Sequence, residues 1–188
     1  MTPQPSPQPD AGVRAAREVD ADALGALHAR AWQASYGELL PDTAAPALAP
    51  ESLAQSWRAA VVDPPTRDHR LLVATSGADV MGFVALAPTS DADTDPATEV
   101  ELLVLLIDPD HQHEGHGSRL LNACADTARE RGTAVLRAWV PEADSDRQAF
   151  FQQAGFAADG ATRVLDASGD GASTVREVRW SARLEPLP

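Results

Sequence analysis

The chain has 188 residues, enough for one domain with a substantial core, and 44% of them are hydrophobic, which excludes a disordered protein. Its formal net charge of −13 argues against nucleic acid as a partner, because phosphate contacts need a basic face. The sequence lacks a long apolar run and a signal-peptide pattern, and it has one cysteine, Cys124, so we expect a cytoplasmic protein without a membrane span. The acidity is explained first by solubility and second by attraction of a cationic substrate.

The N-terminal part of the chain alternates proline with polar residues over 1–11, which predicts a flexible tail ahead of one domain at 12–186. Asp20 is the expected N-cap of the first helix, with Val19 and Leu24 placed as a hydrophobic staple. The predicted elements, in chain order, are a strand at 13–18, helices at 21–35 and 51–62, strands at 70–75, 80–87 and 98–107, a helix at 117–131, a strand at 135–140, a helix at 145–154, and strands at 156–165 and 174–184.

The segment at 98–107 is strongly apolar, and by composition its run from Leu102 to Ile107 is compatible with either a helix or a strand. Pro109 just after the run, and the predicted strands before it, favour a strand that is buried on both faces. Antiparallel strands followed by a strand, a helix and a further strand predict an α/β (α+β) fold with a mixed sheet.

The most informative stretch runs from Ile107 to Leu121, where a polar loop with glycines at 115 and 117 leads directly into a helix. Glycines let the main chain approach a ligand, and a helix N-terminus favours negative charge. The loop therefore predicts an anion cradle suited to a pyrophosphate, with an ordinary strand-to-helix turn as the alternative on spacing alone. Three histidines lie in it, but no cysteine or carboxylate cluster completes a metal site, so no metal is expected.

The hexapeptide Gln112-His113-Glu114-Gly115-His116-Gly117 resembles the Q/R-x-x-G-x-G/A motif of the GNAT acetyltransferases. Residues 144–156 are similar to the second signature of that family, N-x-x-A-x-x-F-Y-x-x-x-G-F, and residues 31–41 to the helix and turn that open many bacterial members. The resemblance implies the GNAT fold, a mixed, mostly antiparallel sheet of about six to seven strands that is splayed at its centre and flanked by about four helices.

The resemblance also implies an activity, the transfer of acetyl from acetyl-CoA to a primary amine by direct attack. Backbone amides of the loop would hold the CoA pyrophosphate. Main chain near Ile107 would pair with the pantetheine arm, in a gap where the strand containing Leu105 splays away from the strand containing Leu136. The residues that the resemblance assigns to acetyl-CoA are Leu106, Ile107, Gln112, His113, Glu114, Gly115, His116, Gly117, Ser118, Asp144 and Phe151.

Three of these residues depart from the family pattern. Phe151 replaces a tyrosine that commonly protonates the departing thiolate, and Asp144 replaces an asparagine. Glu114 stands where relatives usually carry a basic or small residue, and Arg119 is placed to compensate its charge. Tyr36, the only tyrosine of the chain, is the candidate to supply the missing acid, with packing or substrate contact as its alternative role.

Glu99 and Glu101 lie two residues apart on the predicted central strand and therefore share a face. Direct attack needs a neutral amine, so a base must take its proton. Glu101 stands where many family members carry a glutamate, and we expect it to be the base, alone or through water, with Glu99 as the second candidate. Their alternative roles are to hold a cationic substrate or to anchor the strand end. A backbone N–H near Leu103 would polarise the thioester carbonyl.

The acceptor amine is expected between the helical segment at 21–62 and the loop at 88–97. This loop carries Asp91, Asp93 and Asp95, which would suit a polyamine, an aminoglycoside or a lysine side chain, or would simply be solvated.

Two functions other than catalysis are compatible with the same residues. The domain would serve as a sensor that binds acyl-CoA with little turnover, or as a GNAT fold that binds no CoA and acts in assembly. The resemblance also allows a homodimer, for which the last strand offers Val178 and Trp180 as contacts.

Overall fold

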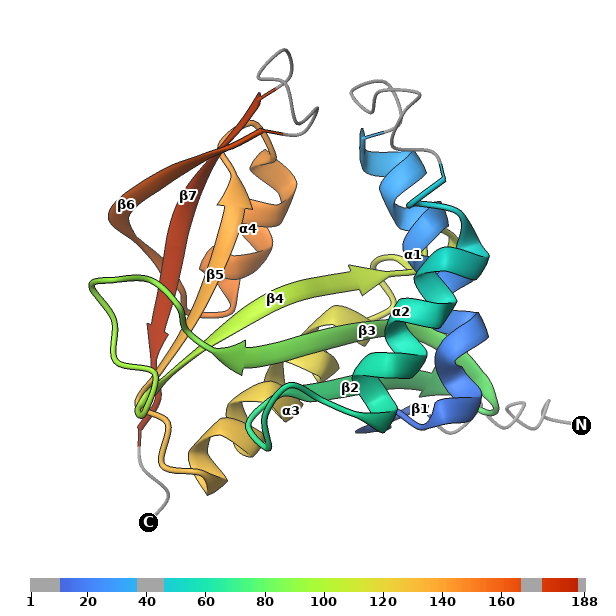
Figure 1. Ribbon diagram of the computed structural model, residues 1–188. Coiled ribbons are helices and arrows are strands. Elements are labelled where there is room, and N and C mark those ends of the chain that lie inside the picture. Colours follow the sequence, from blue (N-terminus) through green and yellow to red (C-terminus); the bar gives the residue numbers. More distant parts are fainter. Residues whose placement is uncertain (1–10, 37–45, 167–173, 186–188) are drawn as a thin grey trace, which may run out of the picture.

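The computed structural model describes residues 11–36, 46–166 and 174–185, and within them the chain forms one seven-stranded sheet with four α-helices (Figure 1). The strands are β1 Ala11–Ala15, β2 Arg70–Ser76, β3 Asp79–Pro88, β4 Glu99–Ile107, β5 Val135–Pro141, β6 Ala157–Asp166 and β7 Thr174–Arg183. The helices are α1 Ala21–Tyr36, α2 Pro50–Val62, α3 His116–Glu130 and α4 Ser145–Gln153, with short 3-10 turns η1 Glu18–Asp20 and η3 Pro109–His111.

The strands lie in the order β1-β2-β3-β4-β5-β7-β6, and β4 with β5 is the one parallel pair of the described sheet. The predicted mixed, mostly antiparallel fold is therefore confirmed, and so is the choice of a strand for the apolar run at 98–107. That strand pairs with β3 along nearly its whole length, and its apolar side chains pack into the cores on both faces of the sheet.

The helices cover both faces of the sheet. On one face, α1 buries Leu24 and Leu27 against Phe83, and α2 lies alongside α1. On the other face, α3 buries Leu120 and Cys124 against the central strands, and α4 packs beside β5. Burial raises the pKa of the Cys124 thiol to about 12, so this cysteine is a buried apolar residue, as predicted.

The N-terminal prediction needs two corrections. The first strand is β1 at Ala11–Ala15, so Ala11 belongs to the sheet and not to the predicted tail, whose residues 1–10 lie outside the described part. The Asp20 carboxylate accepts hydrogen bonds from the Arg17 N–H at 2.7 Å and from Arg14, so its role is to close the η1 turn. Val19 is 79% exposed, and the predicted staple with Leu24 is wrong.

The last strand carries the two side chains expected at a homodimer contact. Trp180 is 9% exposed and belongs to the core under α3, and Val178 is half-buried and packs against the same core. The predicted homodimer stays a prediction. None of the helices in the described residues is long and apolar enough to cross a membrane.

Candidate active site

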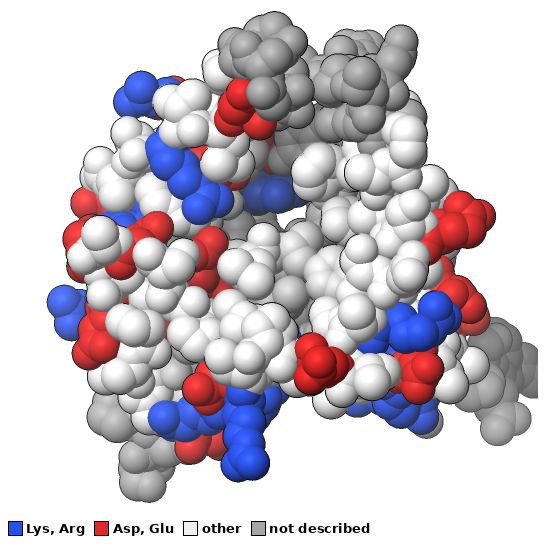
Figure 2. Space-filling model, in the orientation of Figure 1, with Lys and Arg blue, Asp and Glu red and all other residues white. Residues whose placement is uncertain are grey.

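The site begins where β4 leaves β5. The two strands pair only from Glu99 to Leu102 on β4, and beyond that point β4 continues beside β3 while β5 turns away (Figure 1). The space-filling view shows the surface hollowed above β4, between β5 and α1 (Figure 2). The predicted central splay of the sheet is therefore present, and the strand edges that face the gap are not paired with each other.

A bulge interrupts β4 at the start of this gap. Ala85 of β3 pairs with Val104 while the next residue, Leu86, pairs with Leu102, so Leu103 is the extra residue. Leu103 is 55% exposed although it lies in the centre of the sheet. The bulge changes which side chains face α1, and it frees the main chain of Leu103, the residue expected to polarise a thioester carbonyl.

The loop after β4 is shaped by its own backbone. Gly115 has φ 81° and His113 has φ 63°, both in the left-handed region, and α3 starts at His116 directly after them. The first N–H groups of a helix have no partner within the helix, so this end of α3 presents donors together with the positive end of the helix dipole. The anion cradle predicted at 112–117 therefore falls at a left-handed turn and a helix N-terminus.

Gly117 is small for a different reason. A Cβ at this position would lie 3.3 Å from the ring of Phe150 on α4 and 3.7 Å from the Ile107 side chain. The close approach of α4 to the first turn of α3 thus favours glycine here, whereas sequence reasoning had assigned it to the ligand alone.

The Glu114 carboxylate is engaged within the loop. One of its oxygens lies 3.2 Å from His111 Nδ1 and 3.4 Å from Nε2 of the buried His116. Arg119 donates to the Glu114 carbonyl at 3.2 Å, and its guanidinium lies 3.0 Å from His116 Nδ1. Two imidazoles thus contact the carboxylate that departs from the family pattern, and Arg119 holds the main-chain carbonyl of the same residue. No metal-binding group of His, Cys, Asp and Glu occurs among the described residues.

Asp108 links the loop to α1. Its carboxylate accepts from the Asp110 N–H at 3.2 Å, which caps η3, and it forms an ion pair with Arg30 of α1. The Asp108 N–H donates to the Met81 carbonyl at 2.9 Å, which fixes the loop to β3. Sequence reasoning did not identify Arg30 as part of this site, because 78 residues separate it from Asp108.

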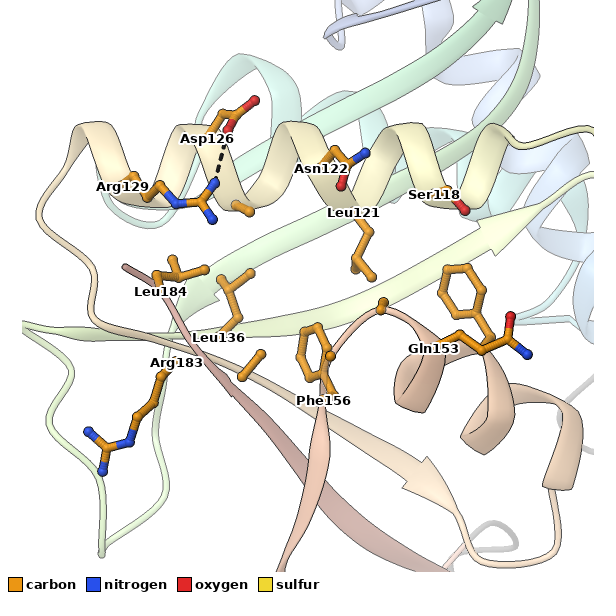
Figure 3. A pocket seen from close by; sticks show the side chains of 15 residues that line it. Ser118, Leu121, Asn122, Asp126, Arg129, Leu136, Gln153, Phe156, Arg183 and Leu184 are labelled. Atoms are coloured by element: carbon orange, nitrogen blue, oxygen red, sulfur yellow. Dashed lines mark hydrogen bonds and ion pairs between the residues drawn. The ribbon is translucent and has the colours of Figure 1, made fainter. Parts of the chain in front are cut away.

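A groove of about 700 Å³ continues from this loop along α3 (Figure 3). In Figure 3, Ser118 lies at its right-hand end and Arg129 at its left-hand end, with α4 and the end of β7 opposite. Leu121, Leu136 and Phe156 make its floor apolar. The face of α3 that carries Ser118 is therefore accessible to a ligand held at the loop.

Glu101 lies on the α1 face of the sheet, because its neighbours Val100 and Leu102 pack under α3. It is 6% exposed, and burial raises the pKa of its carboxyl group. Arg163 on β6 lies 4.0 Å from the carboxylate and acts in the opposite direction. A buried carboxylate beside the gap, two residues before the Leu103 bulge, is well placed to take a proton.

Glu99 shares the face but has a different environment. Its carboxylate accepts from Arg137 Nε at 2.5 Å, and Arg137 also binds Asp159 at 2.7 Å. Glu99 is thus neutralised by an ion pair, in keeping with its alternative role as an anchor of the strand end.

The acidic loop at 88–97 is bound to the sheet. Arg179 of β7 is 5% exposed and donates to Asp91 at 3.0 Å and to Asp93 at 2.6 and 2.7 Å. The Asp95 carboxylate accepts from the Ala97 N–H at 2.9 Å within the loop. Asp91 and Asp93 are thus paired with Arg179, while most of the loop, with Asp93 at 64% side-chain exposure, stays in contact with solvent.

A known protein family matches most of this chain. The model of the Acetyltransferase (GNAT) family matches residues 26–156 of the chain. The chain belongs to this family. No curated protein matches the chain.

Solved GNAT structures share the fold over nearly the whole chain. The PaiA N-acetyltransferase of Thermoplasma acidophilum, in complex with coenzyme A, is 18% identical over 93% of this chain and 99% of its own, with a TM-score of 0.67. The putative acetyltransferase YncA of Salmonella typhimurium, with acetyl-CoA, is 18% identical over 94% and 95%, with a TM-score of 0.69. The ribosomal-protein-alanine N-acetyltransferase of Brucella melitensis is 23% identical over 92% and 99%, with a TM-score of 0.67.

The second GNAT signature lies on α4, and its two departures have structural roles. Phe151 is 3% exposed and packs edge-on against Phe150 and Phe156, with ring centres 5.5 and 5.1 Å away. Asp144 is the N-cap of α4, and its carboxylate accepts from the Arg147 N–H at 3.0 Å. Their predicted contacts with acetyl-CoA stay predictions. Tyr36 ends α1, and its side chain lies outside the described residues.

Proposed function

We propose that this GNAT protein transfers the acetyl group of acetyl-CoA to a primary amine, with Glu101 as the base. One observation carries the proposal. The gap between β4 and β5 opens beside the N-terminus of α3, with the Leu103 bulge and the buried Glu101 at its closed end. Main-chain N–H donors for a phosphate, a free strand edge and a base thus converge on one opening.

The residues present fit acetyl-CoA. The left-handed Gly115 and the first turn of α3 suit a pyrophosphate, because they present main-chain N–H groups and a positive dipole end. The main chain of Leu106 and Ile107 lies past the point where β5 leaves β4, so an extended pantetheine arm has a strand edge to pair with. Glu114 is held by His111 and His116, which limits its repulsion of a phosphate.

Each residue has a defined role in this proposal. Acetyl-CoA supplies the acyl group. Glu101 takes the proton of the attacking ammonium, directly or through water, so that the neutral nitrogen bonds to the acetyl carbon while the carbon–sulfur bond breaks. The Leu103 N–H donates to the carbonyl oxygen as negative charge develops on it. Phe151 donates no proton, and the sulfur leaves as a thiolate, which a thiol pKa of ~8.5 permits.

The test combines binding and turnover. Calorimetric titration measures the affinity of the protein for acetyl-CoA and for free CoA, which we expect the cradle at 112–117 to bind. Acetyl transfer is measured by thiol release with a panel of polyamines, aminoglycosides, amino acids and lysine peptides. We expect micromolar binding of both ligands, and a rate that Glu101→Gln lowers without weakening acetyl-CoA binding. No binding at millimolar ligand would overturn the proposal.

A second function is favoured by one observation, the burial of Phe151 in the position of the usual acid. A GNAT domain without a proton donor for the thiolate would serve as a sensor that binds acyl-CoA. In that case calorimetry detects binding, thiol release stays at the background rate with every amine, and Glu101→Gln changes neither. The length of the acyl group is measured in the same titration with longer acyl-CoA esters.

A further inference from the structure

Arg163 of β6 is held next to Glu101 by two contacts with neighbouring strands. Its Nε donates to the Glu177 carboxylate of β7 at 2.6 Å, and its guanidinium carbon lies 4.5 Å from the ring centre of Trp139 on β5. Its Nη1 lies 4.0 Å from the Glu101 carboxylate. A planar cation that is both stacked and hydrogen-bonded has little freedom, so its charge stays at one place relative to Glu101.

Among the described residues, Arg163 is the cation that lies within 4.0 Å of the Glu101 carboxylate, and it shares its charge with Glu177. Arg179 is shared among three aspartates, and Arg137 is paired with Glu99 and Asp159. The charged groups that act on Glu101 are Arg163 of β6, Asp91 of the β3–β4 loop, and Glu177 and Arg179 of β7.

We propose that Arg163 is a positioning residue for the Glu101 base, which it holds in place and keeps ionised inside a buried site. The inference rests on the proposed function. Asp91 and Glu177 are both negative and act with burial to favour the protonated acid, and Arg163 opposes them. A protonated Glu101 accepts no proton, so without Arg163 the base would work only at higher pH.

The first measurement needs no turnover. The Glu101 carboxyl carbon is followed by NMR through a pH titration of the full chain, with Glu101→Gln used to assign its signal. Arg163→Met keeps an unbranched stem over Trp139 and removes the charge, and we expect the pKa of Glu101 to rise by about one unit. Arg163→Lys keeps the charge and should stay near the wild type. The matched control is Arg176→Gln, because Arg176 pairs with Glu142 at an exposed site.

The second measurement is the pH profile of kcat/KM for an accepted amine. We expect the acid limb to move to higher pH by the same amount in Arg163→Met, and Arg163→Lys to restore it. Arg163→Gln, which keeps a donor for Glu177, is a second charge-free variant should the methionine variant not fold. An unchanged titration of Glu101 in a folded charge-free variant would overturn the inference. An inactive wild-type protein would overturn the proposed function. The NMR titration reports on Glu101 without turnover, so failure of the proposed function can be told apart from failure of this inference.

Discussion

Arg137 on β5 donates from its Nε to the Glu99 carboxylate at 2.5 Å, and this ion pair separates the roles of two glutamates on one strand. Glu99 is bound to a cation that also holds Asp159, so its carboxylate is engaged within the fold. Glu101, two residues further along, is buried and lies beside the gap between β4 and β5. These environments suit Glu99 to anchor the strand end, and Glu101 to the role of base that we propose for it.

We therefore expect Glu101→Gln and Glu99→Gln to differ in their effect on turnover. Removal of a base lowers kcat by about 10²–10⁴-fold, so Glu101→Gln should fall in that range, whereas Glu99→Gln should lower it less than about tenfold. Thiol release measures kcat, and calorimetry should show the same Kd for acetyl-CoA in both variants. An equal loss in both would contradict the separation of roles.

Gly115 in the loop at 112–117 and Gly77 in the β2–β3 turn make a matched pair for testing whether that loop binds acetyl-CoA. Both have positive φ, 81° and 61°, and no atom lies within 4 Å of an added Cβ at Gly77. Alanine at either position should cost about 1–3 kcal/mol in backbone strain and lower Tm by about 2–4 °C per kcal/mol. Only Gly115→Ala should also weaken acetyl-CoA binding in calorimetry. Equal affinity in both variants would show that the loop does not hold the ligand.

Arg30 on α1 is expected to set the position of the same loop through its ion pair with Asp108. Arg30→Ala should raise KM for acetyl-CoA about fivefold, the equivalent of ~1 kcal/mol, with kcat little changed. The control is Arg58→Ala, since Arg58 joins α2 to Asp22 of α1 at 2.9 Å and has no contact with the loop. KM is measured from initial rates at varied acetyl-CoA concentration. An equal rise of KM in the control would mean that any disturbance of α1 has this effect, and that the Arg30–Asp108 ion pair has no special role.

His28 should make the fold sensitive to acid. Burial lowers the pKa of His28 from 6.5 to about 4, and its Nδ1 accepts from Trp57 Nε1 at 3.1 Å. Because the folded pKa is depressed, the unfolded chain binds the extra proton between pH 6.5 and 4. Stability contributed by neutral His28 is thus complete above pH 6.5 and is lost as pH falls toward 4. Melting curves of His28→Gln should show a smaller fall in Tm over this range than the wild type.

Much of the fold could be predicted because its signals are local. Pro109 follows the apolar run of β4, and glycines follow the ends of α3 and α4. These element boundaries therefore depend on one or two nearby residues. The family motif likewise located the loop at 112–117. The bulge at Leu103 could not be predicted. A bulge changes which side chains face each side of the sheet, and in a run of apolar residues this change does not alter the pattern of polar and apolar residues.

The charged partners of the site were unpredictable for another reason. Arg179 reaches Asp91 across 88 residues, and Arg163 comes near Glu101 because β6 pairs with β7 and β7 with β5. From charge alone, the loop at 88–97 would either attract a cationic substrate or be solvated. The pairing of Asp91 and Asp93 with Arg179 attaches this loop to the sheet.

The parallel pairing of β4 with β5 also governs how this chain tolerates change in length. Two parallel neighbours cannot be joined by a tight hairpin, so the chain must return along the sheet between Ile107 and Val135. The loop at 108–115 and α3 make up that return path. Insertions between β3 and β4 lengthen a surface turn, whereas deletions after β4 remove the connection itself. In an engineered or evolving descendant, ligand binding and correct strand order would therefore disappear together.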